Sequence, residues 1–126
     1  MHNYSFSKQE RIHFRNDFQK LFSEGKTFYL YPFKCVYLWQ EATAFSGKLA
    51  VSVSKKKFRK AVDRNKIKRL IRESYRLEKH ILYQEYAKSN QSINILIVYI
   101  GTKIYSFRVI EEQIIELINK IIKKNS

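Results

Sequence analysis

Apolar side chains recur at helical spacing in three segments of the sequence. The first is a short helix with an apolar row at i, i+4, i+7 and i+8, made by Phe14, Phe18, Leu21 and Phe22. Gly25 is well placed to end it, because glycine accepts the left-handed backbone conformation that follows many helices. A long helix is predicted over residues 60–84, and a last helix is predicted to begin at Ser106, a candidate N-cap.

Strand-forming residues fill the intervals between these helices. Residues 27–40 are rich in Tyr, Phe, Val and Leu, and residues 49–53 alternate between apolar and small side chains. Pro32 is expected to precede the well-paired part of its strand or to lie at a sheet edge, because proline lacks an N–H. Residues 93–100 form a short apolar run that is typical of a buried strand.

The order helix, strands, long helix, strand, helix predicts the α+β class. The expected architecture is a small two-layer α/β sandwich, because the strands and helices segregate along the chain. The length of 126 residues suits a single domain over residues 1–126, in which residues 1–13 form a mobile basic arm.

The net charge indicates what this domain binds. The chain has 25 Lys and Arg against 11 Asp and Glu, a formal charge of +14, and such an excess favours a polyanionic partner. Cys35 is the only cysteine, so we expect a small buried hydrophobe in a reducing compartment. No stretch has the length of a membrane span or the apolar core of a signal peptide, so the expected location is the cytoplasm, with no membrane partner.

Most of the charge lies in residues 55–79, where twelve Lys and Arg face only three acids, so that +9 of the +14 falls here. On a helical wheel the apolar face is Ile67, Leu70, Ile71 and Ser74. The opposite face carries Lys68, Arg69, Arg72 and Arg76, with Asn65 among them, and Arg64 and Lys66 flank this group. The pattern therefore predicts a helix that buries one face and presents a cationic stripe on the other.

The residue types of this stripe favour RNA over other polyanionic or membrane partners. Arginine can hold phosphate with two hydrogen bonds, lysine acts as a movable charge, and Asn65 can contact a sugar or a base edge. An ordinary solvated face interleaves acids with bases, and a nuclear-localisation signal does not explain the apolar face. A membrane-surface helix needs apolar anchors on an accessible face, whereas this apolar face is expected in the core.

The same segment resembles the signature of the ribonuclease P protein family. The resemblance is carried by Val51 to Lys56 (VSVSKK), by Lys60-Ala61 and by Arg64 to Glu73 (RNKIKRLIRE), with Asp17-Phe18, Leu21-Phe22 and Gly25-Lys26 upstream. It covers residues 8–80 by motif, and the last strand and helix by pattern only. Lys66 stands where many members have Arg, and Arg59 and Ala50 stand where many have Gly; these departures concern local loop geometry more than function.

The resemblance implies a fold, a function and a set of partners. The fold is an αβββαβα sandwich, like domain 2 of ribosomal protein S5, with a left-handed βαβ crossover that breaks the usual rule of handedness. The function is that of the protein subunit of ribonuclease P, an endoribonuclease that removes the 5′ leader of precursor tRNA. The implied partners are the catalytic RNA subunit, which carries the chemistry with Mg²⁺, and precursor tRNA; no protein partner is implied. Composition alone also allows a non-catalytic protein that binds structured RNA, such as a ribosomal or assembly factor.

The resemblance also implies site residues. By motif position, the RNA-binding residues are Lys55, Lys56, Lys60, Arg64, Asn65, Lys66, Lys68, Arg69 and Arg72. Phe18 and Phe22 would line a leader cleft between the first helix and the sheet, although the spacing of these phenylalanines alone favours a core. The alternation in the strand places Phe33, Cys35, Tyr37 and Trp39 on one face and Lys34, Val36 and Leu38 on the other, and it leaves open which row faces the cleft.

The sequence offers no catalytic or metal-binding residues of its own. A self-sufficient nuclease would need an acidic cluster or a His pair to bind metal, and His2, His13 and His80 lack any ligand spacing. Glu112 and Glu116 share a helix face, where a solvated surface is the favoured interpretation. There is no Gly-rich phosphate loop either. The chemistry is therefore expected to lie outside the protein.

Overall fold

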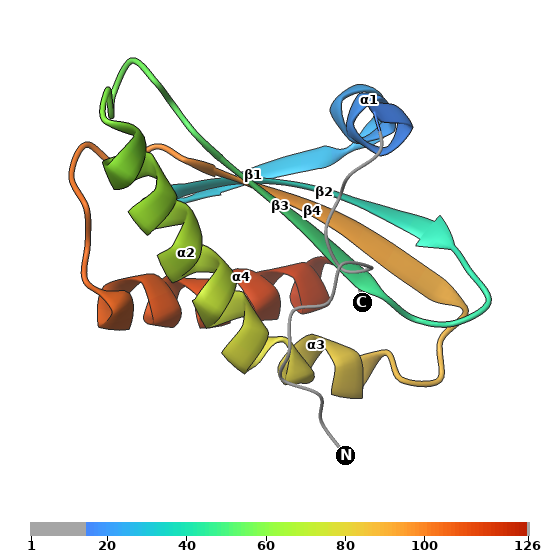
Figure 1. The fold of residues 1–126 in the computed structure, drawn as a ribbon. Helices are drawn as coiled ribbons and strands as arrows, with labels where there is room; N and C mark the ends of the chain where they lie inside the picture. The colour runs from blue at the N-terminus through green and yellow to red at the C-terminus, as the bar shows by residue number, and fades with distance from the viewer. Residues whose placement is uncertain (1–14, 126) are drawn as a thin grey trace.

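The computed structural model describes residues 15–125, and Figure 1 shows the order of their elements. The elements are α1 (Arg15–Glu24), β1 (Lys26–Leu30), β2 (Phe33–Glu41), β3 (Gly47–Val53), α2 (Ala61–Glu78), α3 (His80–Glu85), β4 (Gln91–Tyr99) and α4 (Phe107–Asn125). The predicted α+β class and the αβββαβα order are confirmed, with one helix divided in two. The arm predicted over residues 1–13 lies outside the described residues, as does Phe14.

The strands form one mixed sheet in the order β1-β2-β4-β3. β1 and β2 are an antiparallel hairpin about Tyr31-Pro32, so Pro32 lies in a turn before the well-paired part of β2, as predicted. β3 and β4 are parallel neighbours, and the chain between them crosses over through α2 and α3. In Figure 1 both strands run from right to left, β3 lies nearer the viewer, and these helices lie below the sheet, so the crossover is left-handed.

The main core lies between one face of the sheet and the helices α2, α3 and α4. From β2 this core takes Phe33, Cys35 and Tyr37, with Trp39 packed against it, so the structure decides which row of this strand is buried. Cys35 is fully buried, and burial raises the pKa of its thiol. The predicted interpretation of Cys35 as a small buried hydrophobe is therefore confirmed.

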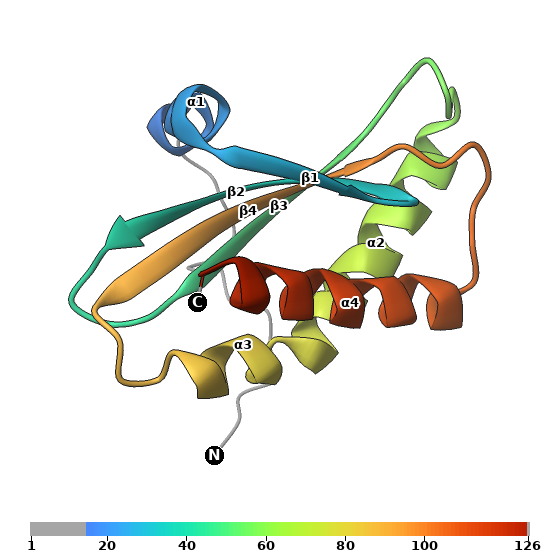
Figure 2. The same cartoon turned by 180° about the vertical axis from the view of Figure 1, so that it is seen from behind.

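The opposite face of the sheet is covered in part by α1 (Figures 1 and 2). Leu21 of α1 packs there on Val36 and Leu96, and Phe18 is partly buried against the same cluster. Gly25 ends α1 as predicted, but the predicted reason is wrong, because no described glycine has a positive φ. A Cβ at this position would instead collide with the carbonyl oxygen of Leu21, so the need for glycine is one of space.

The single helix predicted over residues 60–84 is wrong, because the chain turns at Lys79 between α2 and α3. The Leu82 N–H donates to the Lys79 carbonyl at 3.0 Å, a spacing of three residues that tightens the turn. Lys79 is only 5% exposed, and its ammonium lies 5.7 Å from the centre of the Tyr83 ring. The turn directs α3 along the end of the sheet toward the start of β4 (Figure 1).

Gly47, the first residue of β3, is held by two tyrosines of the crossover. Its N–H donates to Tyr83 Oη and its carbonyl accepts from Tyr75 Oη, both at 3.0 Å. A Cβ at this position would lie 2.6 Å from Tyr75 Oη, so glycine is required by the close approach. Both parts of the crossover are thereby tied to the first residue of its entering strand.

We expect Tyr75→Phe to lower the free energy of unfolding by about 1–3 kcal/mol, because the buried carbonyl of Gly47 loses this donor. Urea denaturation followed by circular dichroism measures the change. Tyr29→Phe is the matched control: Tyr29 is exposed, so loss of its hydroxyl should change stability by less than about 0.5 kcal/mol. Equal stabilities of Tyr75→Phe and the unaltered protein would contradict the prediction.

Candidate RNA-binding surface

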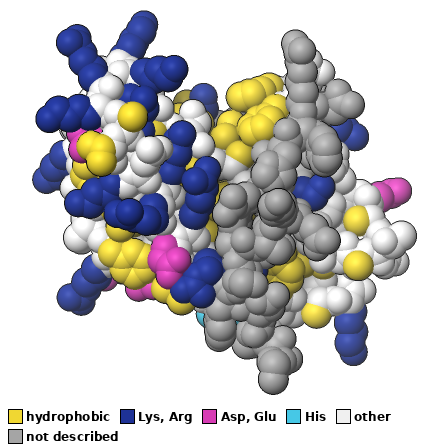
Figure 3. Space-filling model, viewed as in Figure 1, with side chains coloured by type: hydrophobic (Ala, Val, Ile, Leu, Met, Phe, Trp, Pro, Cys, Tyr) yellow, Lys and Arg dark blue, Asp and Glu magenta, His cyan; other side chains and the backbone are white. Residues whose placement is uncertain are grey.

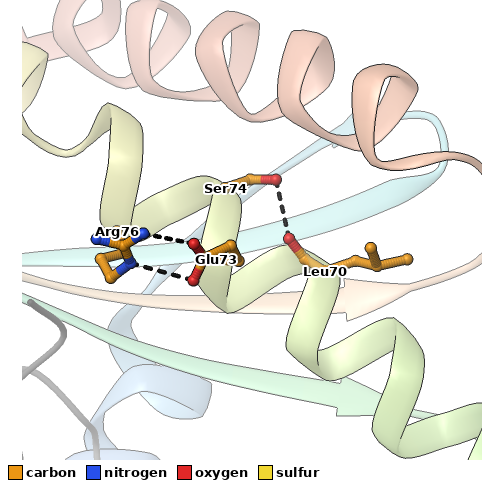
Figure 4. Close-up of polar contacts among 4 residues, drawn as sticks. All are labelled: Leu70, Glu73, Ser74 and Arg76. Atoms are coloured by element: carbon orange, nitrogen blue, oxygen red, sulfur yellow. Dashed lines mark hydrogen bonds and ion pairs between the residues drawn. The ribbon is translucent and has the colours of Figure 1, made fainter. Parts of the chain in front are cut away.

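The helix α2 buries one face and leaves its cationic face accessible. Its buried residues are Ile67, Ile71, Ser74 and Tyr75. The Ser74 hydroxyl donates to the Leu70 carbonyl at 2.8 Å, so the polar residue on this face has a partner within its own helix (Figure 4). The predicted commitment of the apolar face to the core is confirmed.

The predicted RNA-binding residues of α2 lie on its accessible side. Asn65, Lys66 and Arg69 are exposed, and Lys68 and Arg72 are half-buried. Figure 3 shows Lys and Arg side chains gathered on the side of the molecule where α2 and the loop before it lie. The fold therefore brings these cations together on one surface, as the helical wheel predicted; their contacts with RNA stay a prediction.

The loop between β3 and α2 adds further cations to this surface. Lys55, Lys56 and Lys60 are all exposed. At the start of the loop, Ser54 Oγ accepts from the N–H groups of Lys56 and Lys57 at 3.2 and 3.4 Å. These bonds and the turn they close give the lysine run a defined backbone.

Phe58 anchors the same loop to the core. Its ring is buried, with its centre 5.9 Å from that of Tyr99, and its N–H donates to the Ser54 carbonyl at 3.1 Å. The role of Phe58 was not predicted from the sequence. The available signal is that Phe58 is the one apolar residue in a run of seven positions otherwise filled by serine, lysine and arginine. Because this side chain turns inward, its cationic neighbours are left on the surface.

Arg64 shapes this surface as well as adding charge to it. Its Nη1 donates to the carbonyl oxygens of Phe58 and Arg59, at 2.7 and 2.9 Å. One nitrogen of the guanidinium thus ties the loop to the first turns of α2. The sequence predicted Arg64 only as an RNA contact. Its hydrogen bonds to the loop depend on a loop conformation that cannot be predicted from the spacing of residues in the sequence.

Arg76 pairs with an acid on its own helix. Its Nε donates to Glu73 Oε2 at 3.1 Å and its Nη2 donates to Oε1 at 2.5 Å (Figure 4). This pairing lowers the pKa of the Glu73 carboxyl and raises the pKa of the Arg76 guanidinium. Arg76 is not among the residues that the motif position assigns to RNA.

The phenylalanines of α1 have different environments. Phe18 is half-buried against the sheet, whereas Phe22 is 68% exposed. The core position that spacing alone favours is therefore wrong for Phe22, because Leu21 and Phe18 face the sheet and Phe22 points to solvent. On the same face of the sheet, Leu38 and Val98 are only partly buried. The role of Phe18 and Phe22 in holding a leader stays a prediction.

Among the described residues, Glu111 of α4 lies beside Glu78 of α2, and burial together with this neighbouring carboxylate raises the pKa of the Glu111 carboxyl. Within residues 15–125, no three side chains of His, Cys, Asp and Glu lie together in a way that could hold a metal ion. Glu112 lies 3.4 Å from Arg108 in an exposed pair at i, i+4. Across the same residues, none of the helices is long and apolar enough to span a bilayer.

Relatives of this chain share one family. The family model described as ribonuclease P matches residues 6–122. The ribonuclease P protein component of Porphyromonas gingivalis is 39% identical over 109 residues, which cover 86% of this chain and 80% of that protein. The protein component of Dictyoglomus turgidum is 43% identical over 82 residues, 65% of this chain and 66% of that protein.

Solved structures agree with the sequence comparison. The RNase P protein of Staphylococcus aureus superposes with a TM-score of 0.66 at 28% identity, covering 90% of this chain and 95% of that one. The RNase P protein of Thermotoga maritima gives a TM-score of 0.69 at 24% identity, with coverage of 88% and 96%, and supports the fold. The extent of the family match and the identity to the Porphyromonas gingivalis protein together show that this chain belongs to the ribonuclease P protein family.

Proposed function

We propose that the chain binds ribonuclease P RNA through α2 and the loop before it, as a protein component of this endoribonuclease. The observation that carries the proposal is the shape of the cationic surface. Lys55, Lys56 and Lys60 project from an anchored loop, and the exposed cations of α2 continue from it. A preorganised row of this kind costs little conformational entropy when it meets phosphates.

The electrostatics of α2 favour a bound polyanion. Like charges at i, i+4, such as Lys68 and Arg72, destabilise an isolated helix by a few tenths of a kcal/mol per pair, on the order given by peptide helices. Phosphates between such side chains turn this repulsion into attraction and release counterions from the RNA. Lys60, which precedes α2, makes no side-chain cap to the helix. The N-terminus of a helix favours an anion through its partial positive charge.

The second part of the proposal is that α1 and the open sheet face hold the 5′ leader of precursor tRNA. Phe22 presents an exposed ring beside Phe18 and the apolar surface of the sheet. Aromatic faces stack on any base, which suits a leader whose sequence differs from one tRNA to the next. This assignment follows the motif position of the two phenylalanines in the family.

The third part is that the RNA subunit, with Mg²⁺, carries the cleavage chemistry in the cytoplasm. The proposed protein surface is rich in cations, which can bring RNA and substrate together but supply no metal ligands. Its contribution would be to screen repulsion between two RNAs and to position the substrate. A non-catalytic RNA-binding protein remains the alternative, and the cleavage experiment below separates the two.

Removing one exposed cation should weaken RNA binding and reduce its salt dependence. For Arg69→Ala or Lys66→Ala, we expect the log–log slope of affinity against salt to fall by about 0.7–0.9 per lost phosphate contact. Filter binding of ribonuclease P RNA between low and moderate salt measures the slope. Arg108→Ala removes the same charge from α4 at an exposed site and should leave the slope unchanged. Unchanged slopes for Arg69→Ala and Lys66→Ala would contradict the phosphate contacts.

Phe22→Leu should weaken binding of leader-bearing precursor tRNA by the assembled enzyme by about fivefold to a hundredfold, because one stacked base is worth about 1–3 kcal/mol. Mature tRNA, which lacks the leader, should bind as before. The side chain is exposed, so thermal unfolding should stay close to that of the unaltered protein. Equal losses for precursor and mature tRNA would exclude a leader contact at Phe22.

Cleavage of precursor tRNA at low Mg²⁺ should require both the protein and its cognate RNA, because neither alone supplies both the chemistry and the screening charge. Lys66→Ala should slow single-turnover cleavage at low Mg²⁺, and added Mg²⁺ should restore most of the rate. By contrast, Glu112→Gln, Glu116→Gln and His80→Gln should leave the chemical step unchanged at saturating protein. If one of them abolished this step at high Mg²⁺ with assembly intact, the protein would supply a catalytic group.

A further inference from the structure

Two tyrosines meet at the end of the sheet nearest the basic loop. Tyr31 lies in the β1–β2 turn and is 51% exposed, and Tyr105 lies between β4 and α4. Their rings are edge to face, with centres 6.1 Å apart and planes at 86°, and Tyr105 Oη donates to Tyr31 Oη at 3.2 Å. A ring that is half exposed beside a second ring contributes little to the core and offers an aromatic surface to a partner.

The backbone on both sides of this pair is held firmly. The Gln113 side-chain amide of α4 donates to the Tyr31 carbonyl, and the Ile100 N–H donates to the Pro32 carbonyl at 2.8 Å. On the other side, the hydroxyl of buried Tyr99 donates to the Lys103 carbonyl at 2.7 Å. The two rings are therefore ordered before any partner binds, which reduces the entropy cost of binding.

Two lysines flank the tyrosines. The Lys103 ammonium lies 5.1 Å from the centre of the Tyr105 ring, and Lys57 Nζ donates to the Ile100 carbonyl at 3.1 Å. Lys57 follows Lys55 and Lys56 in the exposed loop, so the aromatic pair continues directly from the proposed RNA-binding surface. Aromatic faces with lysines beside them are the combination that binds single-stranded nucleic acid.

We propose that the exposed ring of Tyr31, held edge to face by Tyr105, is a stacking platform for an unpaired nucleotide of the ribonuclease P RNA, with Lys57 and Lys103 beside its phosphates. The inference rests on the proposed function and adds a base contact to the phosphate contacts of α2. The nucleotide is unpaired because a base within a duplex has both of its faces stacked on its neighbours.

The position of the platform selects the RNA subunit over the leader as its occupant. Tyr31 is adjacent to Lys57 through the turn at Ile100, whereas α1 joins the opposite end of β1. The five residues of β1 separate these ends by about 17 Å. An RNA that contacts the basic loop therefore reaches the platform without passing the two phenylalanines of α1.

Two substitutions at one position separate stacking from a structural role. Tyr31→Leu removes the ring, and we expect affinity for ribonuclease P RNA to fall about tenfold at fixed salt, the size of one stacked base. The log–log slope against salt should stay the same, because no charge is lost. Tyr31→Phe keeps the ring and loses only the hydroxyl bond, so it should bind within about twofold of the unaltered protein.

Tyr29→Leu is the matched control, since it removes another exposed tyrosine from the same hairpin. Tyr29 lies on the other side of the hairpin, where the Lys34 ammonium is 6.0 Å from its ring centre. The affinity of the Tyr29→Leu variant for the RNA subunit should equal that of the unaltered protein. Thermal unfolding of each variant reports whether the hairpin stays folded.

Three results would overturn the platform. The first is a folded Tyr31→Leu variant with unaltered affinity for the RNA subunit. The second is an equal loss in Tyr31→Phe and Tyr31→Leu, which would mean that only the hydroxyl bond matters. The third is a loss confined to leader-bearing precursor tRNA, which would assign the platform to the leader. Failure of the unaltered protein to bind the RNA subunit would overturn the proposed function itself, so the two failures are distinguishable.

Discussion

The packing of the apolar face of α2 is the interaction on which the functional surface depends. Ile67, Ile71 and Tyr75 are fully enclosed, and α2 contacts both β3 and α4. When a helix buries one face, the residues on its opposite face are necessarily exposed. The orientation of the cationic stripe is therefore a consequence of the hydrophobic effect. Burial of the apolar face places the positive charges on one surface without any electrostatic attraction to the rest of the protein.

The anchored loop extends this surface beyond the helix. Phe58 reaches the core and Arg64 Nη1 binds two loop carbonyls, so the lysines at residues 55–57 have a firm backbone beneath them. In this arrangement one arginine of the motif serves the protein's own structure. The net charge does not distinguish one arginine from another. The hydrogen bonds do: Arg64 donates to a loop carbonyl, whereas Arg76 donates to the Glu73 carboxylate.

The register of the strands determines what lies beside this surface. Val53 at the end of β3 is paired with Tyr99 at the end of β4, and Tyr99 is paired with Phe33 at the start of β2. The basic loop, the turn after β4 and the tip of the hairpin consequently meet at one end of the sheet. Residues from three distant parts of the sequence are thereby brought to one place, and α1 remains at a distance on the opposite face.

The sequence by itself determined the elements, the buried face of α2, the family and the cationic stripe, because each rests on local periodicity or on residue identity in order. Only the tertiary structure decided which side chains of β2 face the main core. Both faces of this strand carry apolar residues in the sequence, and the packing of α2, α3 and α4 on one face determines which set lies in that core. The tertiary structure also decided the break at Lys79 and the exposure of Phe22. Both depend on where a neighbouring element lies. Tyr31 and Tyr105 are 74 residues apart and meet only through the sheet register, a long-range pairing that no local pattern contains.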